Sequence, residues 1–421
     1  MRVSIVPAEV PAEIGARARP ADRYLRRLVF RRLRDMTRGR LAIHDTDGEH
    51  DFGVVGSEAD PTARVYIYDA RVYSRIALRG TVGAGEAYML GWWDCDDLTA
   101  VVRLLVINRS VMESLEGGLS RLTTPMLRMF HALRRNTRRG SEENISAHYD
   151  LGNAFYRLWL DDSMTYSCGI FEQVDSSLQT AQHAKYQRIC DKLALSPEDR
   201  VLEVGGGWGG FALHAATHCG CHVTTTTISR EQFEFTQARV TEAGLEDRVT
   251  VLCQDYRDLR GQYDKLVSIE MFEAVGHQYF DTYFEACSRL LKSDGLMLLQ
   301  SITIAESEFE RAKREVDFIQ RYVFPGGCLP SVSAMMHAVG RASDLRVQHL
   351  EDIGLHYATT LRHWRQRFND RLQAVRQLGF GDRFARLWNF YLSYCEGGFQ
   401  ERAIGTVQVV FEKADYRSNR P

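Results

Sequence analysis

The sequence lacks several features that would place it in whole classes of protein. Only nine of its 421 residues are proline and 26% are charged, which excludes collagen-like and disordered chains. The 53 basic and 55 acidic residues give a formal net charge of -2, so there is no overall basic field for nucleic acid. No apolar run approaches the about 18 residues of a membrane-spanning helix. A folded chain of about two to three domains remains.

Cysteine usage excludes further classes. The nine cysteines are scattered, odd in number and never spaced C-x-x-C. This pattern suits a reducing compartment and argues against a structural zinc site, so no metal site is expected. The first residues, MRVSIVPAEVPAEIG, contain no apolar stretch long enough for a signal peptide. We therefore expect a cytoplasmic protein.

Residues 16–40 carry ten arginines and only two acidic residues, with apolar residues at helical spacing between them. This pattern predicts a basic amphipathic helix. Such a helix can lie on an anionic bilayer, which would make the protein peripheral to the inner leaflet, or it can pack as an ordinary surface helix. The arginines whose replacement by glutamine tests lipid docking are Arg23, Arg26, Arg27, Arg31 and Arg32.

A second arginine cluster marks a change of pattern along the chain. Arg134, Arg135, Arg138 and Arg139 lie in a polar stretch that is a plausible linker, and we place a domain boundary there, giving domains 1–140 and 141–421. The first domain shows short strand-like runs, and its GEAYMLGWWDCDD segment indicates a turn into a helix. The runs are 41–44, 64–67 and 76–78.

The second domain alternates apolar strand-like runs with helix-length segments. This alternation predicts an α/β fold with a mostly parallel, doubly wound sheet. A closing strand is expected in GTVQVVFEK, residues 405–413. The other strand-like runs are 201–204, 222–227, 249–253, 265–269 and 296–300.

The sharpest local signal is VLEVGGGWGG, residues 201–210, where a strand ends in an acid and alternating glycines: Glu203, Gly205, Gly207. Glycines there allow a tight turn and close approach of a ligand to the backbone. Residues 210–230 contain no acid to hold an NAD ribose, and the loop lacks the Lys-Ser/Thr of a triphosphate site. S-adenosylmethionine (SAM), which carries no phosphate, remains as the candidate cofactor.

Polar residues at the next strand ends would complete a SAM pocket. Thr227, Ile228 and Gln232 follow the second strand, and Asp255 and Tyr256 follow the third. The Asp255 carboxylate would accept from the adenine amino group and the tyrosine ring would flank the base. The alternative role for Asp255 is a helix N-cap.

At this point the residues resemble one family, the cyclopropane fatty acid synthases and mycolic acid methyltransferases, within the class I SAM-dependent methyltransferases. The resemblance implies a Rossmann-like, seven-stranded, mostly parallel sheet with helical lid insertions, plus a smaller N-terminal α/β domain. The GEAYMLGWWDCDDL stretch is similar to the membrane-associated front domain of the longer bacterial members. The matching segments include HYDLGNAFYRLWLDDSMTYSCGIF (148–171), SIEMFEAVG (268–276), RYVFPGGCLPS (321–331) and YCEGGFQERAIGTVQVVF (394–411).

The resemblance also implies residue roles. Tyr166 and Ser167 would lie against SAM, and a bicarbonate ion would act as general base. Gln300 stands where the family usually has histidine; its amide can donate to the anion but cannot carry a proton, so we expect bicarbonate binding with altered pH dependence. Glu270 and Gly206 stand where the family commonly has glycine and cysteine. The positions assigned to bicarbonate are Cys168, Glu273, Gln300, Ile302 and Tyr322.

The family's reaction explains why such residues are needed. Methyl transfer to an isolated alkene leaves a cation-like intermediate, which requires a dry site lined by aromatic faces. A base must then remove a proton, and a protein carboxylate in that role risks being alkylated. The aromatic candidates are Tyr166, Phe171, Phe272, Tyr322, Trp364 and Phe399.

We therefore expect an enzyme that forms cyclopropane rings on unsaturated acyl chains of phospholipids at an anionic membrane surface. The family commonly dimerises, so a homodimer is among the implied partners, and nucleic acid is not. Other readings stay open. They are a related enzyme that leaves a methyl or methylene branch, a non-catalytic lipid-binding protein with a SAM pocket, and an O- or N-methyltransferase of small molecules.

Overall fold

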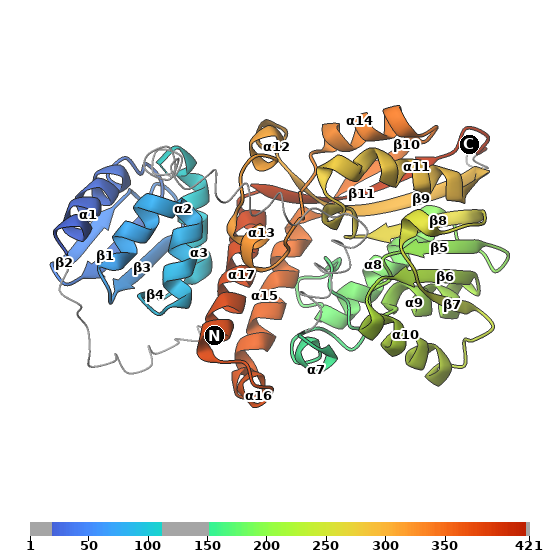
Figure 1. Ribbon diagram of the computed structural model, residues 1–421, viewed down its shortest axis with the longest axis horizontal. Coiled ribbons are helices and arrows are strands. Elements are labelled where there is room, and N and C mark those ends of the chain that lie inside the picture. Colours follow the sequence, from blue (N-terminus) through green and yellow to red (C-terminus); the bar gives the residue numbers. More distant parts are fainter. Residues whose placement is uncertain (1–18, 112–150, 418–421) are drawn as a thin grey trace. The chain divides into compact units, whose positions relative to one another are not determined.

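A computed structural model of the chain describes residues 19–111 and 151–417 (Figure 1). It contains two compact units. The first holds 19–111 together with 315–321 and 368–403, and the second holds the remaining described residues. A single cut in the sequence therefore does not separate the units. The boundary at residue 140, Arg17 and the arginine cluster at 134–139 lie outside the described residues, and the division 1–140 and 141–421 stays a prediction.

The first unit is a small α/β domain, as predicted. Its sheet has the strand order β2-β1-β3-β4, with β1 and β3 parallel. Helix α1 buries Leu25, Val29 and Leu33, which are spaced four residues apart, and this confirms the amphipathic helix. The elements are α1 (Pro20–Leu33), β1 (Arg40–Asp45), β2 (Gly48–Phe52), β3 (Thr62–Ile67), α2 (Arg71–Met89), β4 (Trp93–Cys95), α3 (Leu98–Ile107), α13 (Phe318–Tyr322), α16 (Leu372–Gln377) and α17 (Asp382–Gln400).

Two predictions for this unit were wrong. Residues 76–78 belong to helix α2 and not to a strand, because Val72, Tyr73 and Ala77 bury one helical face around them. A three-residue apolar run does not distinguish a strand from a buried helix segment. The GEAYMLGWWDCDD segment ends α2, turns, and forms the short strand β4 before α3 begins.

The second unit contains the predicted doubly wound sheet. Its order in the described part of the chain is β10-β11-β9-β8-β5-β6-β7, and β11 runs antiparallel to both of its neighbours. Strand β5 lies between β8 and β6, so the strand order reverses there and the carboxyl ends of β8, β5 and β6 share one edge. The strands are β5 (Arg200–Val204), β6 (His222–Thr227), β7 (Val249–Cys253), β8 (Tyr263–Ile269), β9 (Leu291–Ile304), β10 (Arg346–Asp352) and β11 (Ile404–Glu412).

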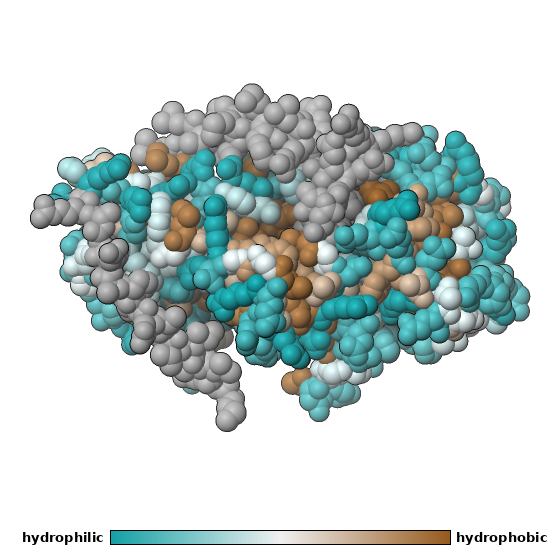
Figure 2. Space-filling model, turned by 60° about the horizontal axis from the view of Figure 1, so that its bottom comes forward, coloured by the Kyte–Doolittle hydropathy of each residue, from teal (hydrophilic) through white to brown (hydrophobic). Residues whose placement is uncertain are grey.

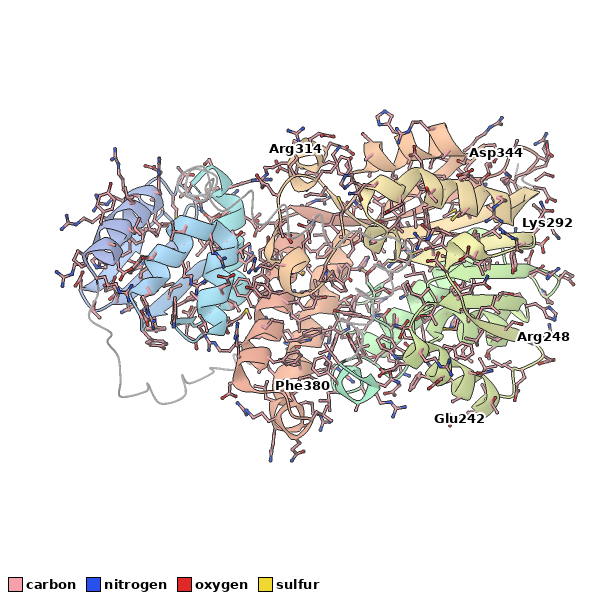
Figure 3. The ribbon with its side chains drawn as sticks, in the orientation of Figure 1. Glu242, Arg248, Lys292, Arg314, Asp344 and Phe380 are labelled. Atoms are coloured by element: carbon pink, nitrogen blue, oxygen red, sulfur yellow. The ribbon has the colours of Figure 1, made fainter. Side chains whose placement is uncertain are left out.

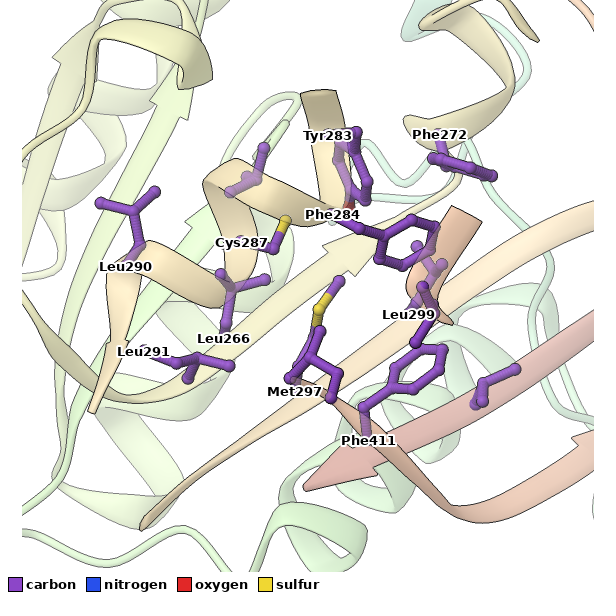
Figure 4. Packing of buried hydrophobic residues seen from close by; sticks show 14 of the residues in the cluster. Leu266, Phe272, Tyr283, Phe284, Cys287, Leu290, Leu291, Met297, Leu299 and Phe411 are labelled. Atoms are coloured by element: carbon purple, nitrogen blue, oxygen red, sulfur yellow. The ribbon is translucent and has the colours of Figure 1, made fainter. Parts of the chain in front are cut away.

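Apolar side chains cover both faces of this sheet. Helices α8, α9 and α10 pack on one face, and α11 and α14 pack on the other (Figure 1). Figure 4 shows Leu266, Met297 and Phe411 from three strands meeting Phe284 of α11. The helices are α7 (Asn153–Tyr156), α8 (Leu178–Leu193), α9 (Gly210–Cys219), α10 (Arg230–Glu242), α11 (Phe280–Leu290), α12 (Glu306–Ala312), α14 (Val332–Ala342) and α15 (Gly354–Asp370).

Charged side chains occupy the outer surface. In the second unit, Lys292 pairs with Asp264 and Asp344 pairs with Lys413 at the periphery seen in Figure 3. Hydrophilic residues are interspersed with hydrophobic ones on the face shown in Figure 2. Among the helices in the described part of the chain, none combines the length and apolar character needed to cross a bilayer.

Candidate active site

The glycine loop joins strand β5 to helix α9 at the carboxyl edge of the sheet. Gly205 and Gly207 have positive φ angles of 83° and 55°, which other residues rarely adopt. A Cβ on Gly207 would meet no atom within 4 Å, so backbone there is open to a ligand. Glu203 is buried at the end of β5 and accepts from the Thr225 hydroxyl at 2.6 Å. Burial raises the pKa of Glu203 to about 7.

The hydrogen bond between Thr225 and Glu203 also explains why glycine occupies position 206. A Cβ at this position would lie 1.8 Å from the Thr225 Oγ1, so the cysteine common in the resembling family does not fit this loop. We expect Gly206→Cys to lower the free energy of unfolding by about 1–3 kcal/mol through overpacking. Adding Thr225→Ala removes the clashing hydroxyl and should recover part of the loss, as urea unfolding of the two variants would measure. An unchanged urea midpoint for Gly206→Cys would contradict this account.

The end of β6 lies beside the glycine loop, and the residue after β7 lies beside the end of β6. Gly206 N donates to Thr226 O at 2.8 Å, and Gln254 N donates to Thr227 O at 3.0 Å. The Thr227 hydroxyl donates to Gln232 Oε1 at 2.7 Å, so these two predicted residues are in contact. Ile228, which lies between these two residues in the sequence, is half-buried. The predicted residues of the second strand end therefore meet at this edge.

Asp255 adopts the alternative role that its position allowed. It is the N-cap of the 3₁₀ helix Tyr256–Asp258, and its carboxylate accepts from the Arg257 backbone at 2.9 Å and from the Arg257 side chain. Any adenine contact by Asp255 would compete with this arginine. Tyr256 is half-buried and packs edge-on against Tyr283 at 5.5 Å. Their contact with SAM stays a prediction.

Tyr166 lies among aromatic rings. Its ring centroid is 5.2 Å from that of Trp159, 5.3 Å from Trp364 and 5.7 Å from Tyr156, and those three neighbours are fully buried. We call the rings of Tyr156, Trp159, Tyr166 and Trp364 the aromatic group. A cation beside the aromatic group would be stabilised by the ring faces and shielded from water.

Some of the predicted aromatic residues lie elsewhere. Phe272 belongs to the hydrophobic core, where its ring lies 4.4 Å from Phe280 (Figure 4). Phe171 stacks on His363, and Phe399 lies in the first unit. The sequence around these three phenylalanines did not distinguish a packing role from a catalytic role, because each lies in a segment that contains apolar residues.

The loop that carries Tyr166 is tied to helix α8 by a buried lysine. Lys185 Nζ donates to Ser167 Oγ at 2.7 Å, and its side chain is fully buried. Burial lowers the pKa of Lys185 to about 8, although nearby Glu270 raises it. Cys168 follows in the loop, and its thiol donates to the Gly169 carbonyl at 3.2 Å. Burial raises the pKa of Cys168, so the thiol stays protonated.

Glu270 is the residue whose role the sequence did not reveal. It follows β8 with a positive φ of 51°, a strained conformation that glycine adopts freely. Its Oε1 accepts from Cys168 N at 2.9 Å and from Gln300 Nε2 at 2.8 Å, and its Oε2 accepts from Tyr357 OH at 2.6 Å. These three donors favour the charged carboxylate, while desolvation raises the pKa of Glu270. Part of its surface stays exposed.

Glu273 lies three residues further along, in the 3₁₀ helix Phe272–Ala274. Its Oε1 accepts from Ile302 N, and its Oε2 finds no hydrogen-bond partner within residues 19–111 and 151–417. Burial first, and then the charge of Glu270, raises the pKa of Glu273 to about 8. This shift favours the protonated form of Glu273, in which Oε2 can act as a donor. Tyr322 is half-buried at the end of α13, and its catalytic role stays a prediction.

The donors that remain do not fit a bicarbonate ion well. The Cys168 backbone and the Gln300 amide donate to Glu270, the Ile302 backbone donates to Glu273, and the Cys168 thiol faces carbonyl oxygens. Gln300 does donate to an anion as predicted, but that anion is the Glu270 side chain. Bicarbonate could use the Cys168 and Gln300 donors only by displacing Glu270, and the Ile302 donor only by displacing Glu273.

The glycine loop and the Glu270 region are adjacent. A Cβ on Gly205 would lie 2.6 Å from the Met271 side chain, so the turn after β5 touches the segment after β8. Over residues 136–409 the chain matches the family described as mycolic acid cyclopropane synthetase. It belongs to this family. The predicted family membership and the predicted class I methyltransferase fold are thereby confirmed, and this family member is a SAM-dependent methyltransferase.

Individual relatives extend the match to the front of the chain. This chain is 37% identical over 356 residues to the cyclopropane-fatty-acyl-phospholipid synthase of Escherichia coli K12. The match covers 83% of this chain and 88% of that protein. The chain is also 37% identical over 367 residues to the tuberculostearic acid methyltransferase UfaA1 of Mycobacterium tuberculosis, covering 85% of each. The cyclopropane synthase CmaA1 complexed with SAH and CTAB superposes with a TM-score of 0.61 at 32% identity, covering 65% of this chain and 98% of that one.

Proposed function

We propose that this enzyme adds a carbon from SAM to the cis double bond of an unsaturated phospholipid acyl chain, forming a cyclopropane ring. One arrangement carries the proposal. The Glu270 carboxylate accepts from Tyr357, whose ring packs edge-on against Trp364 at 5.9 Å, and Trp364 packs against Tyr166. A base thus lies next to rings that can stabilise a cation.

The residues around the glycine loop suit SAM, because Gly207 leaves open space and Glu203 and Gln232 supply polar groups. When bound, SAM supplies an electron-poor methyl group to the alkene. The aromatic group then faces the cation that forms on the acyl chain, and its burial excludes the water that would add to that cation.

Glu270 completes the reaction in this proposal. Its carboxylate takes one proton from the new methyl group, and the electron pair of that C–H bond closes the third side of the ring. Three hydrogen bonds hold its oxygens, which lowers the nucleophilicity that would otherwise lead to alkylation. The raised pKa brings this base closer to neutral pH, where proton transfer is most effective.

A methylene branch is the second candidate outcome, and a saturated methyl branch would in addition require a hydride donor that reduces the methylene. The paired departures from the family pattern at Glu270 and Gln300 favour a branched product, and a relative at 37% identity is named a tuberculostearic acid methyltransferase. A methylene branch arises if a hydride shift moves the cation onto the carbon that carries the methyl before the same methyl proton is lost. The base is then shared by both outcomes.

The deciding experiment uses the purified full chain with SAM and vesicles of oleoyl phospholipid. Proton NMR of the extracted lipid separates a ring, which gives upfield signals, from a methylene isomer of equal mass. We expect one of these products. If the protein binds SAM but the lipid is unchanged, the chain is a non-catalytic lipid-binding protein. If only a polar acceptor is methylated, it is an O- or N-methyltransferase.

The apolar face of α1 packs inside its own unit, as an ordinary surface helix does, so any docking of α1 to an anionic bilayer uses its arginine-bearing face. Arg23, Arg27 and Arg31 are exposed, and within the described residues they form no ion pair. Arg26 does not belong to this surface, because its guanidinium pairs with Asp45 at 2.6 Å and lies over the Phe30 ring. We propose that the free arginines of α1 hold the enzyme at the surface from which its substrate comes.

A matched pair of double variants tests this docking. Replacing Arg23 and Arg27 with glutamine should weaken binding to anionic vesicles by about thirtyfold, since each arginine near such a surface contributes about 1 kcal/mol. The control replaces Arg38 and Arg40, exposed arginines already paired with Asp60 and Asp51. Vesicle sedimentation gives the affinities. Equal loss in the two variants would show that net charge, and not α1, governs binding.

A further inference from the structure

A row of polar side chains, two of them fully buried, leads from helix α8 to Glu270. Lys192 Nζ donates to Gln408 Oε1 at 2.7 Å, Gln408 Nε2 donates to Gln300 Oε1 at 2.9 Å, and Gln300 Nε2 donates to Glu270 Oε1 at 2.8 Å. Gln408 and Gln300 face each other across strands β11 and β9, and both are fully buried. Neither Lys192 nor Gln408 has a role in the proposed reaction.

Both ends of the row favour one direction: Lys192 donates at the outer end, and at the inner end Gln300 Nε2 donates to Glu270 Oε1 and, at 3.4 Å, to the Cys168 carbonyl. An ammonium group only donates, so Gln408 must present its oxygen to Lys192 and its NH2 to Gln300. Gln300 must then present its oxygen to Gln408 and its NH2 to Glu270. If the lysine donor were absent, only the two acceptors at the inner end would hold this direction, and both amides could turn over together while keeping their mutual hydrogen bond. Gln300 would then place a carbonyl oxygen against the carboxylate.

We propose that Lys192 is a positioning residue for the base: acting through Gln408 and Gln300, it keeps an N–H donor aimed at Glu270 and so keeps Glu270 in its charged, proton-accepting form. This inference rests on the proposed function, because it assigns the base role to Glu270. A carbonyl oxygen in place of the donor would favour protonated Glu270, which cannot take up a proton.

Other groups also face the two ends of the row. At Glu270 they are Lys185 from α8, Tyr357 from α15, Glu273 from the 3₁₀ helix Phe272–Ala274, and Cys168 from the loop before α8. At Lys192 they are Glu351 from β10, whose carboxylate is 2.5 Å from Nζ, and Arg188 on the preceding turn of α8. The test must therefore separate the amide row from the surface ion pairs.

Three variants at the outer end of the row make that separation. Lys192→Met removes the donor, Lys192→Arg keeps a donor-only cation, and Glu351→Gln disturbs the ion pairs but leaves the bond between Lys192 and Gln408. The readout is the pH profile of kcat with oleoyl-phospholipid vesicles. In Lys192→Met the midpoint of the acid limb should move up by about one pH unit, the equivalent of one charge-assisted hydrogen bond.

Two of these variants serve as controls for the shift in the pH profile. Lys192→Arg and Glu351→Gln should keep the wild-type midpoint, and KM for SAM should be unchanged in all. If Lys192→Met does not fold, Gln408→Met tests the row with the ion pairs intact and should give the same shift. An unshifted midpoint in the donor-removing variant, with the wild type active, overturns the inference. A wild type that leaves the lipid unmodified overturns the proposed function instead.

Discussion

Replacing Glu270 with glutamine is expected to lower kcat by about two to four orders of magnitude, the usual contribution of a general base. Glutamine preserves the size of the side chain and can still accept from Tyr357 or Gln300, but it cannot take up the methyl proton. SAM affinity should not change, since the contacts of Glu270 are to Cys168, Gln300 and Tyr357. Single-turnover kinetics with oleoyl phospholipid and calorimetric titration with SAM measure the two quantities.

The same variant separates a side-chain base from bicarbonate. Wild-type turnover should persist in buffer stripped of carbon dioxide, and activity should fall as pH drops through the raised pKa of Glu270, because the base is then protonated. In Glu270→Gln the pKa of Glu273 should fall below about 8, since a neighbouring negative charge is removed. If the wild type needs bicarbonate, or the variant keeps full activity with it, Glu270 is not the base.

Replacing Trp364 with alanine is expected to have the second largest effect. Its ring is fully buried and packs against Trp159, Tyr166 and Tyr357 at 5.3–5.9 Å. The cavity left by the ring should lower the free energy of unfolding by about 3–5 kcal/mol. Water in that cavity would add to the acyl cation, so part of the product should become a methylated alcohol that mass spectrometry detects.

Trp364→Phe is the matched control. It keeps an aromatic face and removes an indole N–H that has no hydrogen-bond partner within the described part of the chain. Its stability loss should stay below that of the alanine variant, and alcohol should be absent. If both variants lose stability equally, or if alanine gives no alcohol, the aromatic group does not keep the acyl cation dry.

The strands of the catalytic sheet could be predicted because their signals are local. Each strand-like run predicted between 201 and 300 is a strand, since these runs are rich in apolar or β-branched residues and helix-length segments separate each from the next. The glycine loop was equally local, as a positive φ at Gly205 and Gly207 requires that residue type. The prediction of a strand at residues 76–78 was wrong because a three-residue run is too short to show the periodicity of either a helix or a strand.

The base site could be predicted only in part, because its contacts join distant segments. The family resemblance named Cys168, Glu273 and Ile302, whose catalytic roles stay predictions, but the pairing of Glu270 with Gln300 depends on strands β8 and β9 lying side by side. Gln408 did leave a signal, as a lone polar residue in an apolar strand. Without the sheet order, nothing in the sequence connected it to Gln300.

The most direct test of the central claim uses SAM whose methyl group carries three deuterium atoms, with vesicles of oleoyl phospholipid. Methyl transfer to the alkene followed by proton loss to Glu270 predicts an acyl chain that gains one carbon bearing two of the three deuterium atoms, as a ring or as a methylene. An acyl chain that keeps all three, or label found only on a polar acceptor, would contradict the account.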